Sequence, residues 1–266
     1  MSVLCVVGRV WGVTALHDVV YVVGRWSSTI MRFNATTRQP LTNINVKDLI
    51  APSGIVACER TSQLYVAGGG LLGNKCVWRV SSDGKVIKHW LPKSPDDTFK
   101  PWTLSVTSTR LLVTSYVTCQ LRQFEADGDE LRRVQLPDHM EPQHAVESPT
   151  GTFIVSLNNE QLEQWQVVEV NTGGEVLRQF SGSRLTSLGV TPHVVVDSYG
   201  NILVADFDNH HILLLDNHFS LRRVIIDEHQ LDCEPPWRLC YREDKGQLLV
   251  ALYDSDRVAV FEVVCC

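Results

Sequence analysis

The sequence predicts an all-β fold, a six-bladed β-propeller, and three features of its 266 residues point to it. A short aliphatic strand recurs six times, a start signal precedes each copy at steps of 41 to 50 residues, and the two chain ends resemble complementary parts of one blade. Four short strands in about 45 residues have the dimensions of a propeller blade. We therefore expect residues 1–266 to form a single propeller domain, with blades starting near residues 10, 52, 101, 142, 192 and 236.

The start signals share a position just ahead of each strand pair, and proline opens five of the six. They are Val10–Val13, Pro52–Ile55, Pro101–Leu104, Pro142–Ala145, Pro192–Val195 and Pro236–Leu239. Proline suits a strand entrance because it has no N–H to donate. The recurring strands that follow are residues 20–23, 64–67, 111–114, 153–156, 202–205 and 248–251.

The spacing between the two central strands of each repeat is nearly constant. Four repeats keep 8 residues between equivalent positions, whereas blade two has 11 and blade four has 12. Surface loops of a repeat protein tolerate insertions. We therefore expect the extra residues of blades two and four to lie in an enlarged surface loop.

The two ends of the chain complement each other. The last repeat reaches Phe261 without a fourth strand, while Val3–Val7 precede the first start signal and have no blade of their own. We expect residues 3–7 to pair with the segment Val258–Phe261, complete the last blade and close the ring. Closure by this exchange leaves no open end of the ring, and exposed strand edges invite pairing with another chain.

Blade five carries the most specific motif. Its residues 192–212 read PHVVVDSYGNILVADFDNHHI. This segment resembles an NHL repeat, in which a proline precedes a hydrophobic strand ending in Asp, then Gly-Asn, a Val-x-Asp strand and Asn-x-Arg-Ile/Val. His211 stands where the family usually has Arg, and blade six keeps Arg257-Val258 but has Leu252 in place of the Asp.

The resemblance implies the C-terminal propeller of tripartite-motif (TRIM-NHL) proteins. In that family the propeller binds substrate proteins or RNA, and RING and B-box modules perform the ligase reaction. The Cys and His spacings of those modules are missing from this sequence. Ligase activity is therefore not expected of this chain.

Composition narrows the classes of partner. The net charge is −6, from 24 basic and 30 acidic residues, which disfavours broad phosphate neutralisation and hence nonspecific nucleic-acid binding. No apolar run approaches the roughly 20 residues that span a bilayer. The eight cysteines lack CxxC or metal-ligand spacing, so we expect reduced thiols in a cytoplasmic protein. Palmitoylation of Cys265 and Cys266 is an alternative.

The candidate binding residues are large rings at the blade entrances. They are Trp11, Trp102, His144, His193 and Trp237. Aromatic residues serve cores and interfaces alike, so the tryptophans either pack between blades with locally bonded indole N–H groups or form a rim available to a ligand. We expect the entrance face to be the working surface.

Pro192-His193 also resembles the proline-histidine dipeptide of peptide-amidating lyases, which are zinc enzymes with a related six-bladed fold. A catalytic zinc needs three protein ligands, and His144 and His193 supply at most two. No serine elbow, HExxH motif or phosphate-binding glycine loop occurs. We therefore expect no metal, no cofactor and no catalytic residue.

Two sets of charged residues have a functional and a structural interpretation. The first set could ligate a metal or serve as turn residues that accept backbone hydrogen bonds. Its members are Asp197, Asp206, Asp208 and Asn209. The second set could contact nucleic acid or belong to solvated outer strands of mixed charge. Its members are Arg122, Arg132, Arg133, Arg222 and Arg223. We favour the structural interpretation of both sets.

The sequence thus predicts a noncatalytic recognition module that binds a protein or peptide on one face. Rigid blades hold loops, and loops carry binding. Sequence-selective RNA binding is one alternative, and a metal-dependent lyase or hydrolase is another. We expect no membrane association and a monomer for the isolated domain.

Overall fold

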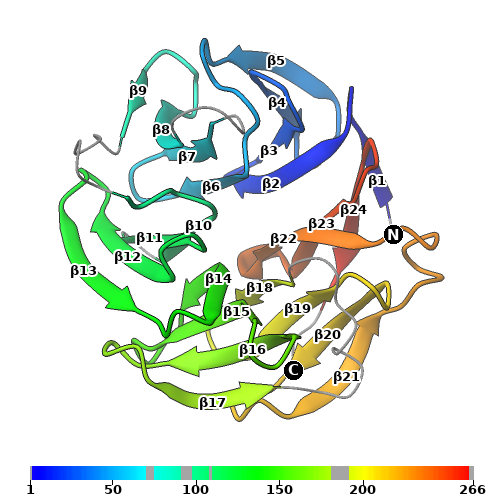
Figure 1. The fold of residues 1–266 in the computed structure, drawn as a ribbon. Helices are drawn as coiled ribbons and strands as arrows, with labels where there is room; N and C mark the ends of the chain where they lie inside the picture. Colours follow the sequence, from blue (N-terminus) through cyan, green and yellow to red (C-terminus); the bar gives the residue numbers. More distant parts are fainter. Residues whose placement is uncertain (1, 70–74, 91–97, 108–109, 181–191, 264–266) are drawn as a thin grey trace.

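The computed structural model describes residues 2–69, 75–90, 98–107, 110–180 and 192–263. These residues form six four-stranded antiparallel sheets arranged in a ring, as the sequence predicted (Figure 1). Cys265 and Cys266, the candidates for palmitoylation, lie outside the described residues.

The first three blades follow one another along the chain. Blade one contains β2 (Val10–Leu16), β3 (Val19–Gly24), β4 (Thr29–Asn34) and β5 (Pro40–Asn45). Blade two contains β6 (Gly54–Cys58), β7 (Gln63–Gly68), β8 (Cys76–Ser81) and β9 (Ile87–His89). Blade three contains β10 (Leu104–Thr107), β11 (Arg110–Ser115), β12 (Gln120–Glu125) and β13 (Glu130–Gln135).

The last three blades include the one that closes the ring. Blade four contains β14 (Met140–Glu147), β15 (Phe153–Asn159), β16 (Gln164–Val170) and β17 (Val176–Phe180). Blade five contains β18 (His193–Val196), β19 (Ile202–Asp206), β20 (His211–Leu215) and β21 (Leu221–Ile226). Blade six contains β22 (Pro236–Arg242), a 3₁₀ turn (Glu243–Lys245), β23 (Gln247–Leu252), β24 (Arg257–Glu262) and β1 (Ser2–Cys5).

Each sheet buries both of its faces against its neighbours. In β3, Val20 and Val22 join the apolar cluster shared with blade six, whereas Tyr21 and Val23 join the cluster shared with blade two. Side chains alternate between the faces of a strand, so a continuous aliphatic run supplies two interfaces at once. Six such clusters occur among the described residues, one between each pair of adjacent blades.

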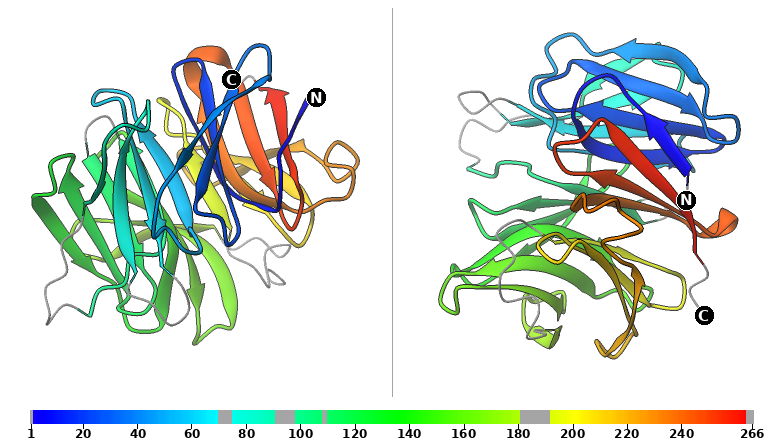
Figure 2. Two further views of the ribbon diagram at one scale, coloured as in Figure 1. Left: turned by 90° about the horizontal axis from the view of Figure 1, so that it is seen from above. Right: turned by 90° about the vertical axis from the view of Figure 1, so that its right-hand side faces the viewer.

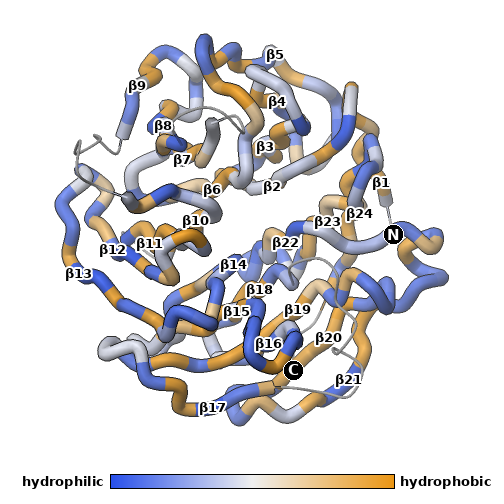
Figure 3. Tube along the Cα trace, in the orientation of Figure 1, coloured by the Kyte–Doolittle hydropathy of each residue, from blue (hydrophilic) through white to orange (hydrophobic). Residues whose placement is uncertain are grey.

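The outer strands have a different character. β13 is largely exposed, and hydrophilic residues follow one another along it at the rim of the ring (Figure 3). Because four antiparallel strands return the chain to the face where it started, every inner strand begins on the same face of the ring. We call this the entrance face; it also carries the loops between the second and third strands. The opposite face, where the inner strands end, is the exit face.

The N-terminal strand closes the ring as predicted. β1 pairs with β24 from Ser2 opposite Val260 to Cys5 opposite Arg257, and the two strands lie side by side in Figures 1 and 2. The Val6 N–H extends the contact by donating to the Asp256 carbonyl oxygen at 2.8 Å. Leu4 packs into the cluster between blades six and one.

The extra residues of blade four do not lie where the sequence suggested. In blade two, seven residues separate β7 from β8, whereas four separate β15 from β16, as in the remaining blades. Blade four instead pairs β15 with β16 over seven residues, from Phe153 opposite Val170 to Asn159 opposite Gln164. The prediction of an enlarged loop is therefore wrong for blade four, because its insertion lengthens both strands of the hairpin.

The described residues contain no apolar helix of membrane-spanning length. The six cysteines among them, which are Cys5, Cys58, Cys76, Cys119, Cys233 and Cys240, are free thiols.

Deleting residues 1–9 should lower the free energy of unfolding by several kcal/mol, on the order of an apolar strand and its hydrogen-bonded ladder. The point substitution Leu4→Ala should remove about 2–5 kcal/mol by itself, because Leu4 is 2% exposed. Val7→Ala is the matched control, since Val7 is 92% exposed. Urea unfolding measures all three, and an unchanged midpoint for the deletion would contradict ring closure.

Candidate functional site

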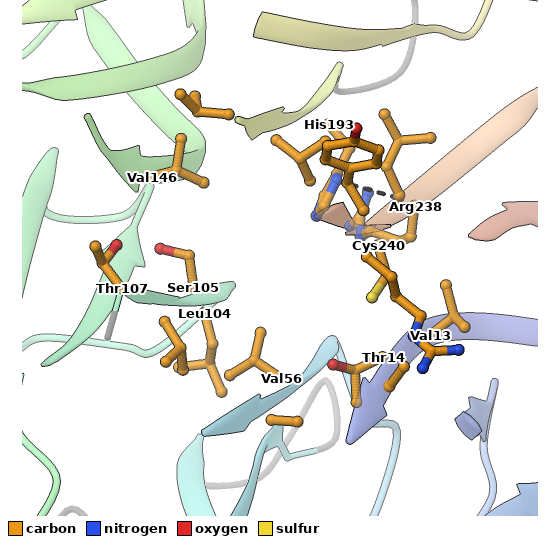
Figure 4. A pocket seen from close by; sticks show the side chains of 18 of the residues that line it. Val13, Thr14, Val56, Leu104, Ser105, Thr107, Val146, His193, Arg238 and Cys240 are labelled. Atoms are coloured by element: carbon orange, nitrogen blue, oxygen red, sulfur yellow. Dashed lines mark hydrogen bonds between the residues drawn. The ribbon is translucent and has the colours of Figure 1, made fainter. Parts of the chain in front are cut away.

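The inner strands of all six blades surround an axial channel with a volume of about 650 Å³ (Figure 4). Its lining runs from residues near the start of each inner strand to the exit-face loops, where Glu59, Ser198 and Asp244 are exposed. The tryptophans at the blade entrances do not line it. The channel therefore opens on the exit face and has its deep end toward the entrance face.

The pairing register divides the blade-entrance residues into two layers. In blades one, four and six a register shift leaves Trp11, Gln143 and Trp237 as extra residues in the inner strand, which is the geometry of a β-bulge. The outer layer is Trp11, Ser53, Trp102, Gln143, Pro192 and Trp237. The layer below it, one residue further along each inner strand, is Gly12, Gly54, Thr103, His144, His193 and Arg238.

Two of the three tryptophans meet in one aromatic cluster. The rings of Trp11 and Trp237 are 4.8 Å apart, and both contact Tyr253 from the β23–β24 loop, at 6.2 and 5.2 Å. Phe207 of the β19–β20 loop completes the cluster, 5.0 Å from Tyr253. Trp237 is buried, whereas Trp11, Phe207 and Tyr253 are partly exposed.

Trp102 belongs to a separate cluster in blade three. Its ring contacts Tyr116 edge-on at 5.2 Å, and the Lys75 ammonium nitrogen lies 4.1 Å from the Trp102 ring centre and 5.1 Å from that of Tyr116. Burial, and then the charge of Lys100, lowers the pKa of Lys75 to about 8. Such a partly desolvated ammonium over two rings is a favourable cation–π arrangement.

The indole N–H groups do not behave as simple core packing predicts. Those of Trp102 and Trp237 are buried, and neither finds a hydrogen-bond partner in the described part of the chain. Buried indole N–H groups ordinarily find one. If the tryptophans served only as packing between blades, their indole N–H groups were expected to form local hydrogen bonds. Trp102 and Trp237 do not form these bonds with any described residue.

The loop aromatics are functional candidates that the sequence reasoning missed. Tyr116, Phe207 and Tyr253 each occupy the first position of a four-residue loop between the second and third strands. Their recurrence at one position in blades three, five and six was visible in the sequence once the loops were aligned. With Trp26 of the equivalent loop in blade one, they carry aromatic rings to the entrance face from four blades.

The two histidines lie together in the inner layer and tie four blades to one another. Their rings stack with centroids 3.8 Å apart. His144 Nε2 donates to the Leu104 carbonyl oxygen of blade three at 3.3 Å. His193 Nδ1 accepts from the Leu239 N–H of blade six at 3.2 Å (Figure 4). Both rings are buried.

The same burial keeps the histidines neutral. Burial, and then the charge of Arg238, lowers the pKa of His144 to about 3. Burial also lowers the pKa of His193 well below its ordinary value, followed by the charges of His144 and Arg238. The hydrogen bonds assign each neutral ring its proton on Nε2.

Arg238 is the residue of this layer that the sequence analysis overlooked. It is 4% exposed, and its guanidinium carbon stacks 4.1 Å from the Trp237 ring centre. One nitrogen, Nη1, donates to the Trp237 carbonyl oxygen at 3.1 Å, while Nε and Nη2 have no partner among the described residues. Burial lowers the pKa of Arg238 to about 9. Arg238 is the equivalent of His144 and His193 only because Trp237 is an extra residue in its strand, which the spacing of the sequence does not show.

The acidic candidates in blade five serve their own turns. Asp197 Oδ1 accepts from the backbone N–H groups of Tyr199 and Asn201 at 2.9 and 2.8 Å. Asp206 accepts from the Asn209 side-chain amide at 2.9 and 3.0 Å. No group of three or more potential metal ligands occurs within the described ranges, which include Asp208.

The candidate arginines lie in blades three and five, and three of them form ion pairs with nearby acids. Arg122 and Arg133 share Glu130, at 3.6 and 3.0 Å, and Arg222 pairs with Asp216 at 3.0 Å. Arg132 and Arg223 lie on the exposed outer strands β13 and β21. The pairs of Arg133 and Arg222 are typical of a mixed-charge surface. Arg122 is 5% exposed in β12, so the expectation of a solvated outer strand is wrong for this residue.

Comparison with known proteins identifies the fold but no family. No protein-family model and no curated protein matches the chain. Many solved structures share its fold. They include hydrazine synthase from Kuenenia stuttgartiensis, with 15% identity over 97% of this chain and 84% of that chain and a TM-score of 0.66.

Two further structural neighbours have different roles. Virginiamycin B lyase from Staphylococcus aureus, solved with quinupristin, has 15% identity over 96% of this chain and 80% of its own, with a TM-score of 0.66. A chain of the nidogen–laminin complex has 15% identity over 83% and 81%, with a TM-score of 0.64. The class of protein is thus a six-bladed β-propeller, a fold used by enzymes and by binding scaffolds.

The buried neutral histidines should make the protein acid-sensitive. In the unfolded state His144 takes up a proton near pH 6.5, whereas in the folded state it does so only near pH 3. The free energy of unfolding is therefore highest above pH 6.5 and decreases as the pH falls below that value. At pH 5 the loss from His144 should be about 2 kcal/mol. His144→Gln keeps an N–H for the Leu104 carbonyl but does not titrate, so its stability should fall less between pH 7 and 5.

Chemical denaturation at several pH values measures this difference. His229→Gln is the matched control, because His229 is exposed on a loop. Equal pH slopes for the wild type and His144→Gln would contradict the assignment of a buried neutral ring.

Protein purified without chelator should contain no stoichiometric zinc. Both histidines already use a ring nitrogen in a hydrogen bond between blades, which leaves fewer nitrogens for a metal than a three-ligand site requires. Metal analysis by mass spectrometry is the measurement. One zinc per chain that disappears in His193→Ala would contradict this expectation.

Proposed function

We propose that the chain is a noncatalytic recognition module that binds a protein or peptide on its entrance face. The observation that carries this proposal is the gathering of aromatic rings from four blades on that face. Trp and Tyr combine large apolar area with a polar group and dominate binding hot spots, particularly beside Arg. The blades hold these rings on short loops of a rigid scaffold, which keeps the ordering cost of binding low.

The distribution of exposed apolar side chains supports the same face. Away from the outer strands, the large exposed apolar residues of the entrance face are Val7, Trp26, Ile50, Val117 and Leu162. On the exit face the corresponding residues among those described are Val86 and Tyr199. Apolar side chains concentrated on one face, with polar residues around them, are typical of an interaction surface.

Trp26 is the most accessible of the rings. It is 58% exposed, and the Arg25 guanidinium carbon lies between two rings, 4.9 Å from Trp11 and 5.7 Å from Trp26. Trp26 has a φ of +63°, a conformation that is unfavourable for a bulky side chain. Strain of this kind concentrates at functional sites, so the loop holds an aromatic ring outward at a conformational cost.

A polypeptide fits the surface charge better than RNA does. The chain carries a net charge of −6, and three of the candidate arginines are paired with acids. RNA binding on the NHL pattern would require a basic face that neutralises phosphates. The likeness of blade five to NHL repeats agrees with either ligand, and the nidogen–laminin complex is a precedent for protein binding by this fold.

Trp26→Ala should weaken binding of a peptide partner at least tenfold, because truncation of a hot-spot aromatic costs about 2 kcal/mol or more. Peptides selected from a random phage-displayed library against immobilised wild-type protein would serve as ligands. Fluorescence anisotropy measures their Kd for the variants. Tyr199→Ala is the matched control, since Tyr199 is 75% exposed but belongs to the exit face.

Selected peptides that bind Trp26→Ala and Trp102→Ala as tightly as the wild type would contradict the assignment of the entrance face. Tighter binding of random RNA oligonucleotides than of any selected peptide, with an affinity that falls steeply as salt rises, would favour the RNA alternative.

A further inference from the structure

We propose that the entrance face binds a polypeptide segment of mixed charge in one orientation, with the acidic end of the segment over blades one to three and its basic end over blades four to six. This inference rests on the proposed function, because it concerns the same face, and it adds the charge pattern and the direction of the ligand. Its basis is the separation of charge across the face, together with two apolar contact points in opposite blades.

Charges of opposite sign occupy opposite halves of the entrance face. Each blade presents to this face the link that leads into it and the loop between its second and third strands. In the described segments of blades one to three bases predominate; they are Arg9, Arg25, Lys47, Lys75 and Lys100, beside the acid Asp48. In blades four to six the described charged residues of these segments, histidine apart, are acids, namely Asp138, Glu160, Glu163, Asp208, Asp227, Glu228, Asp232, Glu234, Asp254 and Asp256. Such a separation creates an electrostatic field that runs across the face.

Many of these charges are not neutralised within the protein. Arg9 pairs with Asp254 at 2.6 Å, where the basic and acidic halves meet. The bases that form no ion pair with a described residue are Arg25, Lys47, Lys75 and Lys100. The acids in the same condition include Asp138, Glu160, Glu163 and Asp256. Both halves therefore retain charge that a ligand of complementary pattern would neutralise.

Two exposed apolar side chains lie at opposite sides of the face. Trp26 is 58% exposed and Leu162 is 55% exposed, and they belong to equivalent loops of blades one and four, which lie across the ring from each other (Figure 1). Arg25 precedes Trp26, whereas Glu160 and Glu163 stand on either side of Leu162 in the sequence. An extended segment that reaches both contacts meets a base beside the first and acids beside the second. The complementary ligand carries an acidic residue at the Trp26 end and a basic residue at the Leu162 end.

The corner of blades two and three shows how the basic half would hold an acidic side chain. Lys75 Nζ lies 4.1 Å from the Trp102 ring centre, and the exposed Lys100 is close enough for its charge to contribute, after burial, to the lowered pKa of Lys75. Two ammonium groups without a described acid between them repel each other. A carboxylate of the ligand placed beside them would relieve this repulsion, while a neighbouring apolar residue packs on the exposed part of the aromatic surface.

The rim of the ring distributes its charges differently. There the described bases lie next to acids, as in the pairs Lys85–Asp83, Arg178–Glu169 and Arg222–Asp216, each at 3.0 Å. Interspersed charges of this kind favour solubility without a field over a long distance. Separation of charge by sign on the face that also carries the exposed rings is therefore a property of that face, and it would orient a ligand before contact.

Peptides of about 15 residues, roughly 50 Å when extended, are long enough to serve as probes. The probes are members of a random library that bind the wild type and lose affinity in Trp26→Ala. Their sequences should place acidic residues toward one end and basic residues toward the other. A photo-crosslinking group at the acidic end should label blades one to three, and one at the basic end should label blades four to six, as identified by mass spectrometry.

Charge inversion at each side tests the field directly. At low salt, Glu163→Lys and Arg25→Glu should each raise the Kd of the probes about threefold to tenfold, and high salt should remove most of the loss. Glu175→Lys and Lys85→Glu are the matched controls, because they make the same charge changes at exposed residues of the exit face. A probe whose basic residues are changed to Glu should bind Glu163→Lys more tightly than it binds the wild type.

The failure of this inference is distinguishable from that of the proposed function. Probes that depend on Trp26 but bind Glu163→Lys and Arg25→Glu as tightly as the two controls would overturn the charge pattern and leave peptide binding intact. Cross-links from the acidic end to blade four would overturn the orientation. Peptides that bind Trp26→Ala and Trp102→Ala as well as the wild type would overturn the proposed function, and this inference with it.

Discussion

The burial of both faces of every blade is the constraint on which this structure depends. A four-stranded sheet with two apolar faces is stable only between two partners, and a row of such sheets always leaves two faces uncovered unless it closes. The four residues of β1 provide that closure, because they give blade six its fourth strand and place Leu4 against blade one. Strand pairing and blade packing therefore support the same ring.

Closure also determines what can meet at the centre. Each blade contributes one residue to each of the two layers at the start of the inner strands. Aromatic side chains that are far apart in the sequence therefore lie next to each other. Trp11 and Trp237 come from the first and last blades and lie 4.8 Å apart, and His144 and His193 meet from blades four and five at 3.8 Å. The bulges at Trp11, Gln143 and Trp237 decide which residue of each pair faces outward and which lines the channel.

The sequence predicted the elements whose signals are periodic. The six aliphatic strands, the start signals and the exchange of strands at the ends follow from spacing, and the structure confirms the ring. Spacing could not show whether four extra residues in blade four enlarge a loop or lengthen a hairpin, because both add the same number of residues between two reference positions. It also could not reveal a bulge, which shifts a side chain by one position without altering the repeat length. Spacing alone therefore groups the entrance tryptophans with the histidines and does not distinguish Arg238 from its neighbours.

Two other arginines of the protein, Arg122 and Arg257, can be compared with Arg238 in the channel wall. Arg122 is as buried as Arg238, yet it has Glu130 at 3.6 Å and two hydrogen bonds to Gln120. Arg257, in β24, binds Asp232 and Glu234 at 2.9 and 2.6 Å, and these acids raise its pKa. Burial without such acids lowers the pKa of Arg238. The fold thus supplies carboxylates to its structural arginines, and the guanidinium on the channel wall is the one in this comparison that lacks them. Arg238 is held instead by the carbonyl oxygen and the ring of Trp237, and neither of these groups carries a negative charge.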